Sequence, residues 1–331
     1  MSDLYPAIEP YEHGMLDVGD GNLIYWEQSG NPHGRPVLLL HGGPGSGWNA
    51  GIRRNFDPVA YRIIAFDQRN CGRSTPNAGD PVIDLSANTT EHLLADIEQL
   101  RRHLGVERWM LFGGSWGATL ALAYAERHAE LVTGIILVAV TTTRQSEIDW
   151  LYYGAAKFFP AEWQRFRAGI PAGETNLVAA YHRLLMDPDP AVHSKAARDW
   201  FEWENALVSV DPDAKPSPRQ LEPRWQLAFA RIVTHYFGNL AWLEDGALLR
   251  DAGRLRGIPG ILIHGRFDMG GPPTTAWELA QAWPDARLVI LGGAGHSAGD
   301  PGMQDALLAA TDEFARGFNA RPLPGDRAPT S

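Results

Sequence analysis

Short runs of apolar residues recur along this chain, and most of them end in a polar or glycine-containing loop. The runs PVLLL, RIIAF, WMLF, GIILVAV and GILI are apolar at nearly every position, without the alternation of a half-exposed strand. Segments with helical spacing of leucine and isoleucine lie between them. Strands that are apolar on both faces are typical of a parallel sheet covered by helices on both sides. We therefore expect an α/β fold.

The order of the predicted elements also indicates an insertion. The expected strands lie within residues 23–30, 35–43, 61–74, 108–114, 132–140, 257–268 and 286–297, and the expected helices lie at residues 89–105, 118–128, 274–284 and 303–318. From 141 to 244 the segments are rich in aromatic residues and look helical, and no strand is predicted. The simplest interpretation is a core of residues 1–140 and 245–331, with a helical cap of residues 141–244 inserted into it.

Composition excludes several classes of partner. A formal net charge of −10 and a pI near 5.5 argue against binding to nucleic acid or to an anionic membrane. Cys71 is the only cysteine, which excludes internal disulfides and thiolate zinc sites and favours the cytoplasm. We expect Cys71 to be buried as a small apolar residue.

The two ends of the chain and the lengths of its apolar runs predict neither a secretory signal nor a membrane span. Residues 1–21 are acidic and lack the apolar region of a secretory signal, and no run is long enough to span a bilayer. Residues 319–331 are rich in proline and polar residues, which predicts a loose tail.

The segment GGSWG places Ser115 between a predicted strand and a predicted helix. It fits the pattern G-x-S-x-G, in which the glycines permit a strained turn that lifts the serine hydroxyl out of the sheet. The five-letter pattern is weak by itself, and its position in an alternating α/β pattern gives it weight. Ser115 is therefore the candidate nucleophile.

A serine nucleophile needs a base and an acid that orients the base. In this kind of fold both follow the serine in the chain, on loops after later strands. Asp268 follows the run GILIHGRF, and His296 follows ARLVILGGAG, so both have the required type, order and position. His264 and His235 compete as bases, but the first lies within a predicted strand and the second lies in the predicted cap.

The glycine-rich loop HGGPG follows the predicted strand PVLLL. Its backbone amide at Gly43, together with the amide of Trp116, would form an oxyanion hole. Asp67 and Arg69 follow another strand, and we interpret them as a pair that braces its loop.

The segments LLLHGGPG, AFDQRNCGRS, WMLFGGSWGATLALAYAERH, SEIDWLYYGA, FARIVTHYF, HGRFD and AGHS resemble the proline iminopeptidase (prolyl aminopeptidase) family, and the likeness runs from about residue 10 to 318. The resemblance implies an α/β-hydrolase fold with an inserted helical cap. It also implies a serine peptidase without cofactor or metal, which removes an N-terminal proline, with Ser115 as nucleophile, Asp268 as acid and His296 as base. The implied partner is a small peptide, amide or ester, and the oligomeric state is left open.

The family binds the free amine of its substrate with acidic residues of the cap, and Glu204 occupies one such position. At helical spacing Glu204 shares a face with Trp200, Trp203 and Leu207, while Glu202 points away. A carboxylate on an aromatic face is costly without a cation, which a substrate ammonium would supply; pairing with an arginine of the core is the alternative.

Gly42 and Tyr152 are further predicted substrate contacts, and the sequence departs from the family in three places. Val233 stands in FARIVTHYF where the family usually carries a second acidic residue. Gly270 and Gly271 follow the predicted acid, where family members commonly read DVVCP-like sequences. Val138 and Thr141 occupy positions that we associate with the proline pocket.

These departures leave a second interpretation open. On the same scaffold, a hydrolase of amino-acid amides or small esters would have a relaxed need for a free amine. A binding protein without turnover is disfavoured by the complete set of catalytic residue types, and an enzyme with an aspartate nucleophile is disfavoured by Ser115.

Overall fold

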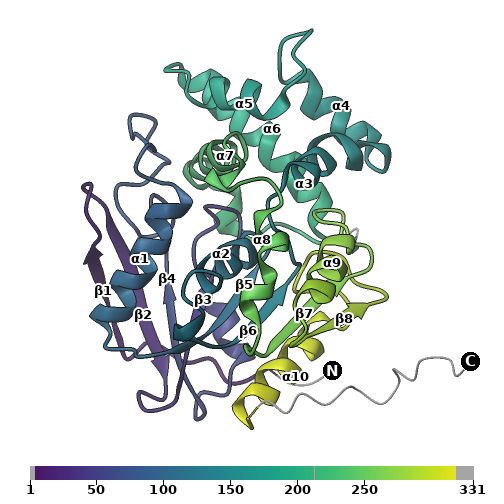
Figure 1. The fold of residues 1–331 in the computed structure, drawn as a ribbon. Coiled ribbons are helices and arrows are strands. Elements are labelled where there is room, and N and C mark those ends of the chain that lie inside the picture. The colour runs from purple at the N-terminus through teal and green to yellow at the C-terminus, as the bar shows by residue number, and fades with distance from the viewer. Residues whose placement is uncertain (1–3, 212, 318–331) are drawn as a thin grey trace, which may run out of the picture.

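The computed structural model describes residues 4–211 and 213–317 (Figure 1). Within them eight strands form one sheet in the order β1-β2-β4-β3-β5-β6-β7-β8. The strands β3 to β8 run parallel, and β2 is antiparallel to its neighbours β1 and β4. The bounds are β1 (Glu12–Asp17), β2 (Leu23–Gly30), β3 (Arg35–Leu40), β4 (Tyr61–Phe66), β5 (Trp109–Gly114), β6 (Val132–Val138), β7 (Gly260–Gly265) and β8 (Ala286–Leu291).

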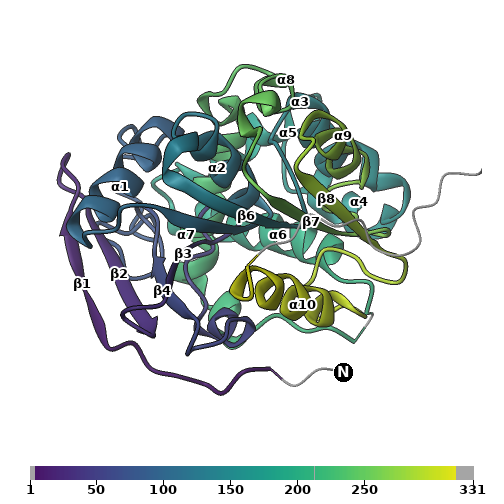
Figure 2. The same ribbon diagram turned by 60° about the horizontal axis from the view of Figure 1, so that its bottom comes forward.

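Helices cover both faces of this sheet. Figure 2 shows α1, α2, α8 and α9 on one face and α10 on the other. The helices are α1 (Thr90–His103), α2 (Trp116–Ala125), α3 (Gln145–Asp149), α4 (Pro160–Ala168), α5 (Leu177–Leu185), α6 (Pro190–Val208), α7 (Pro223–Phe237), α8 (Ala247–Arg250), α9 (Thr274–Ala282) and α10 (Met303–Ala315). The predicted α/β sheet with helices on both sides is confirmed.

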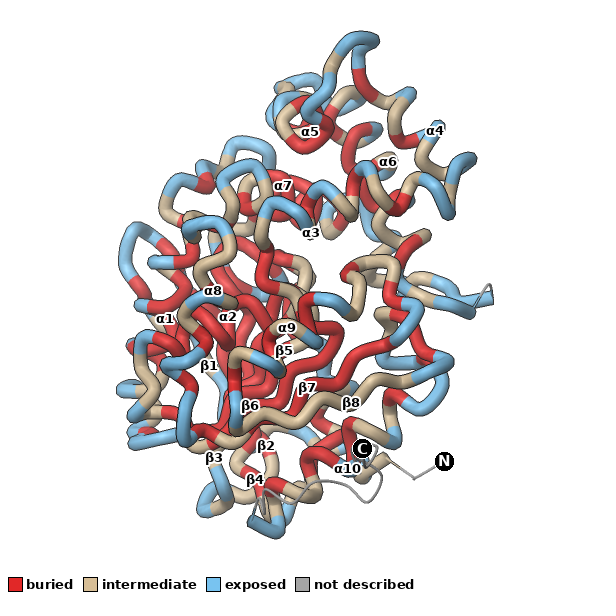
Figure 3. The backbone as a smooth tube through the Cα atoms, turned by 45° about the vertical axis from the view of Figure 1, so that its right-hand side comes forward, coloured by how far each residue is buried: buried red, intermediate tan, exposed pale blue. Residues whose placement is uncertain are grey.

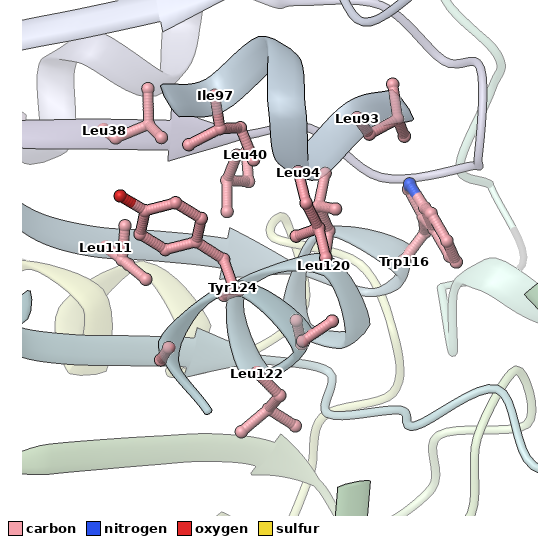
Figure 4. Packing of buried hydrophobic residues seen from close by; sticks show 14 of the residues in the cluster. Leu38, Leu40, Leu93, Leu94, Ile97, Leu111, Trp116, Leu120, Leu122 and Tyr124 are labelled. Atoms are coloured by element: carbon pink, nitrogen blue, oxygen red, sulfur yellow. The ribbon is translucent and has the colours of Figure 1, made fainter. Parts of the chain in front are cut away.

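The strand β3 shows why its run is apolar at every position. Leu38 and Leu40 point into a hydrophobic cluster shared with α1 and α2, which Figure 4 shows from close by. Val37 and Leu39 belong to a different cluster, shared with α10. Successive side chains of a strand point to opposite faces, so a doubly covered strand buries all of them. Figure 3 shows the resulting band of buried residues along the strands.

Between β6 and β7 the chain leaves the sheet and forms α3 to α7, which lie together at the top of Figure 1. These helices share a third hydrophobic cluster, built around stacked aromatic rings such as those of Phe166, Tyr181 and Trp203. Helix α7 contributes to two hydrophobic clusters. Val233 packs in this third cluster, whereas Ile232 packs in the cluster between the sheet and α1–α2. The division into core and cap at residues 141 and 244 stays a prediction.

Element limits differ from the predicted ones mainly at loops. Most strands end two or more residues before the predicted limit, and α2 begins at Trp116 instead of residue 118. Strand β1 was missed, because its sequence EHGMLD is half-exposed and lacks an apolar run. The predicted tail 319–331 lies outside the described residues. Within the described residues, no helix combines the length and apolarity needed to cross a membrane.

The close packing of α2 on the sheet depends on Gly117. A Cβ atom at this position would lie 2.1 Å from the carbonyl oxygen of Leu40, a backbone atom that cannot rotate away. We expect Gly117→Ala to lower the free energy of unfolding by about 1–3 kcal/mol, the usual cost of overpacking.

Urea unfolding followed by circular dichroism measures this change. Gly253→Ala is the matched control, because Gly253 is exposed and a Cβ there meets nothing within 4 Å. Equal unfolding midpoints for the two variants would contradict the packing constraint.

Candidate active site

Ser115 occupies the turn between β5 and α2 in a backbone conformation that non-glycine residues rarely adopt, with φ 56° and ψ −125°. Two hydrogen bonds hold the turn: the Ser115 amide donates to Val138 O at 2.9 Å, and the Ala118 amide donates to Ser115 O at 2.8 Å. The neighbouring glycine is required by space, because a Cβ at Gly113 would lie 2.1 Å from Gly117 O. The strained turn predicted from GGSWG is present.

Asp268 and His296 meet beside Ser115, although they follow different strands. His296 Nδ1 lies 2.9 Å from each carboxylate oxygen of Asp268, and the Gly271 amide donates to Asp268 Oδ1 at 2.8 Å. With Nδ1–H directed at the carboxylate, Nε2 is left to accept a proton. His296 and Ser115 line the same cavity, of about 70 Å³, together with Glu204; we call it the Glu204 cavity.

The electrostatics of this pair follow from burial and from mutual attraction. Burial acts to raise the pKa of Asp268, but the adjacent His296 and the other donors outweigh it, and the pKa is lowered. Burial acts to lower the pKa of His296, but the charge and hydrogen bond of Asp268 outweigh it, and the pKa is raised. The pair therefore favours a carboxylate that stabilises an imidazolium.

The predicted oxyanion donors also line the Glu204 cavity. Trp116 is the first residue of α2, so its amide has no partner within the helix. Gly43 has φ +114°, a conformation that disfavours side chains, and a Cβ there would lie 2.6 Å from the Gly45 amide nitrogen. A Cβ at Gly42 would lie 3.3 Å from Ser115 Cβ, so the glycine loop passes directly beside the serine.

The cap holds the segment that follows this loop. Arg219, in a short 3₁₀ helix at Pro218–Leu221, donates to Trp48 O at 2.9 Å and to Ser46 O at 2.8 Å. Trp225 Nε1 donates to Ser46 O at 3.1 Å. Sequence reasoning missed both residues, because side-chain bonds to backbone carbonyls leave no motif.

Asp67 and Arg69 are both buried and both brace loops, but the prediction that they pair with each other is wrong. Asp67 accepts from the Trp48 amide at 2.5 Å and from Arg73 Nε at 2.8 Å. Arg69 forms ion pairs with Asp96, from Nε at 2.8 Å, and with Asp20, from Nη1 at 3.1 Å. Asp67 thus meets an arginine of its own loop, whereas Arg69 meets carboxylates from other segments.

Glu204 projects from α6 into the cavity that also contains Ser115 and His296. Trp200 and Trp203 of the same helix are buried and Glu202 is exposed, as helical spacing predicts. Burial raises the pKa of Glu204 to about 7, although the hydrogen bond from Tyr152 opposes the shift. Glu204 has no arginine or lysine partner among the described residues.

The predicted substrate contacts Tyr152 and Gly42 lie in different places. The Tyr152 hydroxyl donates to Glu204 Oε1 at 2.6 Å, from a fully buried ring that is not among the described residues lining the Glu204 cavity. Tyr152 thus orients the carboxylate. Gly42 borders a different cavity next to Ser115.

Comparison with known proteins agrees with this geometry. A model of the alpha/beta hydrolase fold matches residues 35–302. A probable proline iminopeptidase of Streptomyces coelicolor is 52% identical over 323 residues, which cover 96% of this chain and 99% of that protein. A proline iminopeptidase of Xylella fastidiosa is 49% identical over 317 residues, covering 95% of this chain and 100% of that protein. The chain belongs to the proline iminopeptidase family of α/β hydrolases.

Solved structures show the same fold. Proline iminopeptidase of Mycobacterium smegmatis superposes with a TM-score of 0.59 at 21% identity, covering 92% of this chain and 98% of that one. The structure of VinJ superposes with a TM-score of 0.63 at 19% identity, covering 94% and 100% of the two chains. The predicted family and its α/β-hydrolase fold are confirmed; the roles of individual residues stay predictions.

The positions that depart from the family are spread over three surroundings, with Val138 bordering the same separate cavity as Gly42. Val233 is fully buried in the cap cluster, and Thr141 and Gly270 line the cavity. A Cβ at Gly270 would lie 2.9 Å from His296 Nδ1, so glycine at this position leaves the histidine–aspartate pair undisturbed. Gly271 contributes its amide to Asp268.

Glu147 is a second carboxylate on the cavity wall, and sequence reasoning missed it. It accepts hydrogen bonds from Thr141 Oγ1 at 2.7 Å, from the Thr143 amide at 2.7 Å and from Thr275 Oγ1 at 2.5 Å. Its oxygens are thus engaged by the loop that it organises. The run TTTRQSE, with threonines ahead of a glutamate in a first helical turn, was the available signal.

Both competing histidines have other hydrogen-bond partners, although His264 Nε2 lies 3.6 Å from Asp268 Oδ2. His264 Nδ1 accepts from the Val140 amide at 2.9 Å and Nε2 donates to Gly271 O at 2.7 Å, and burial lowers the pKa of His264. His235 contacts Asn88 O at 3.0 Å in a different part of the fold. Cys71 is buried, as expected.

If Ser115 is the activated nucleophile, a fluorophosphonate probe should phosphonylate it and no other serine. We expect Ser115→Ala to abolish labelling and His296→Gln to slow it strongly, because the hydroxyl then lacks its base. Intact-protein mass spectrometry measures the adduct.

Ser86→Ala is the control for this experiment, since Ser86 is an exposed serine whose hydroxyl donates to Asp84 at 2.5 Å. It should label like the unmodified protein. An adduct of full stoichiometry on the Ser115→Ala protein would contradict the assignment.

Proposed function

We propose that this protein is a serine aminopeptidase that releases an N-terminal residue, with proline preferred, from small peptides. A half-buried carboxylate in the same cavity as the proposed nucleophile carries this proposal. Glu204 shares a cavity with Ser115 and His296, and burial raises its pKa to about 7. A substrate ammonium would supply the missing cation, and its fixed distance from the serine would select the first peptide bond.

The proposed mechanism is acyl transfer. Ser115 Oγ attacks the carbonyl carbon of the first residue while His296 Nε2 takes the hydroxyl proton. The oxygen of the tetrahedral intermediate accepts hydrogen bonds from the amides of Gly43 and Trp116. His296 returns the proton to the departing amine, and water then attacks the ester by the same route and frees Ser115.

The hydrogen bonds of the second cavity carboxylate, Glu147, support a second candidate function. Glu147 is fully engaged by threonines, and Val233 is apolar and buried, so Glu204 is the cavity carboxylate with an oxygen left for an amine. A site with one such carboxylate favours an amidase or esterase that acts on amino-acid amides or small esters with a relaxed amine requirement. Both candidates use the same nucleophile and base.

The remaining proposals concern the class of substrate, the cellular compartment and the need for a cofactor. The net charge of −10 supports a small-molecule substrate rather than nucleic acid or an anionic membrane. Cys71 is an unpaired, buried cysteine, which suits a reducing compartment, and we place the enzyme in the cytoplasm on that basis. The mechanism requires side chains, backbone amides and water, and we propose no cofactor.

Glu204→Gln separates the two candidates. The variant keeps an oxygen for the Tyr152 hydroxyl but loses the charge, and a charge-assisted hydrogen bond contributes roughly 1.5–3 kcal/mol. We expect kcat/KM for prolyl 4-nitroanilide to fall at least about tenfold, and kcat/KM for an N-acetylprolyl ester to change little.

Glu202→Gln, an equal charge change on the exposed side of α6, is the matched control and should behave like the unmodified enzyme. Equal losses of Glu204→Gln on both substrates would favour the amidase or esterase instead.

The pH dependence of kcat/KM provides an independent test. Glu204 must be ionised and His296 neutral, and both have raised pKa values, that of Glu204 at about 7. Activity on prolyl 4-nitroanilide should therefore be lost as pH falls through this range. The slope of log kcat/KM against pH should approach two in the acid limb.

In Glu204→Gln the slope should approach one, because His296 alone then titrates. An unchanged slope in that variant would remove Glu204 from the amine-binding role.

A further inference from the structure

A second cavity, of about 260 Å³, also reaches Ser115 and His296. Its walls come from the ends of β3, β5 and β6, from a 3₁₀ helix at Ala50–Asn55 and from α10, which lies on the opposite face of the sheet from α2 (Figure 2). We call it the Ile52 cavity. Among the described residues, Ser115 and His296 are the ones that line both this cavity and the Glu204 cavity.

The two cavities therefore meet at the nucleophile and the base. An amide bond positioned for attack by Ser115 has its acyl part on one side of the scissile carbon and its amine part on the other. If Glu204 holds the N-terminal amine, the acyl residue occupies the Glu204 cavity. The departing nitrogen must lie near His296, which protonates it, and the Ile52 cavity borders this histidine.

The walls of the Ile52 cavity are apolar. Ile52, Phe112, Val138 and Leu307 form them, and no lysine, arginine, aspartate or glutamate is among the described lining residues. His41 also borders the cavity, and burial lowers its pKa, so it is neutral near pH 7. A charged side chain in this cavity would lose its hydration without gaining a partner, whereas an apolar side chain would be removed from water.

The residues that line the cavity differ in exposure. Asn49 and Ala298 line it and are exposed, while Phe112 and Leu307 at the inner walls are buried. A side chain can thus enter from the site while the rest of a peptide continues toward solvent between these two residues.

We propose that the Ile52 cavity binds the side chain of the residue after the scissile bond, and that it selects apolar residues there. This assignment rests on the proposed aminopeptidase function and adds the class of leaving group that the enzyme prefers. The substrate class is therefore a peptide that begins with proline and carries leucine, isoleucine, valine or phenylalanine in second position.

Dipeptide amides test the assignment without a free carboxylate near the cavity. The substrates are Pro-Leu-NH₂, Pro-Phe-NH₂, Pro-Gly-NH₂, Pro-Asp-NH₂ and Pro-Lys-NH₂, and proline release gives kcat/KM. We expect the leucine and phenylalanine substrates to exceed the glycine one about tenfold or more, a usual discrimination for an apolar pocket. The aspartate and lysine substrates should be slowest.

A charge at the mouth of the cavity should redirect this preference. Ala298→Lys should raise the ratio of kcat/KM for Pro-Asp-NH₂ over Pro-Lys-NH₂ at least about fivefold, and Ala298→Asp should lower it by a similar factor. Ala298 is exposed, so both variants should fold. Ratios within one variant cancel any effect of the new charge on His296, two residues away.

Val82→Lys is the matched control, because Val82 is 84% exposed and lies outside the cavity; its ratio should equal that of the unmodified enzyme. The ratio of prolyl to alanyl 4-nitroanilide should stay constant in both Ala298 variants, because the acyl residue lies in the Glu204 cavity. A shift in the prolyl-to-alanyl ratio without a shift between the aspartate and lysine substrates would assign the acyl residue to the Ile52 cavity and overturn the proposal.

Two other outcomes are distinguishable. Equal kcat/KM for all five dipeptide amides in an active enzyme would overturn the leaving-group assignment and leave the aminopeptidase function standing. Absence of proline release from every substrate would overturn the proposed function and this assignment with it.

Discussion

The close approach of α2 to the ends of β3 and β5 is the constraint on which the site depends. Gly113 and Gly117 permit this approach, since a Cβ on either would lie 2.1 Å from a backbone oxygen. The contact holds Ser115 at φ 56° and brings the first amide of α2 beside its hydroxyl. Because both come from one packed turn, the Ser115 hydroxyl and the Trp116 amide have a fixed mutual geometry, which the proposed stabilisation of an oxyanion requires.

Three carboxylates surround this turn, and their environments divide their roles. Asp268 faces His296, and its pKa is lowered because the cation that forms there favours the charged form. Glu147 is engaged by threonine hydroxyls and amides and serves the loop it holds. Glu204 is half-buried with no cationic partner in the described part of the chain, and desolvation raises its pKa to about 7. The desolvation cost at Glu204 is the one that a substrate amine would relieve.

The cap serves the chemistry in two ways. It supplies Glu204 from α6, and through Arg219 and Trp225 it holds the segment that follows the glycine loop of Gly43. The same loop borders both cavities that meet at Ser115. The proposed amine site and the proposed oxyanion donors are thus linked through contacts between cap and core.

The sequence by itself determined the parallel sheet, the strained turn at Ser115 and the order in which Asp268 and His296 follow their strands. These features are readable because each depends on a local pattern: apolar runs, glycines at a turn, or a residue at a strand end. Tertiary structure alone decided that Arg69 pairs with Asp96, that Thr275 of α9 reaches Glu147, and that Tyr152 stands behind Glu204. Each of these choices joins side chains from segments brought together by packing, and a buried polar group takes whichever partner the completed fold places within reach.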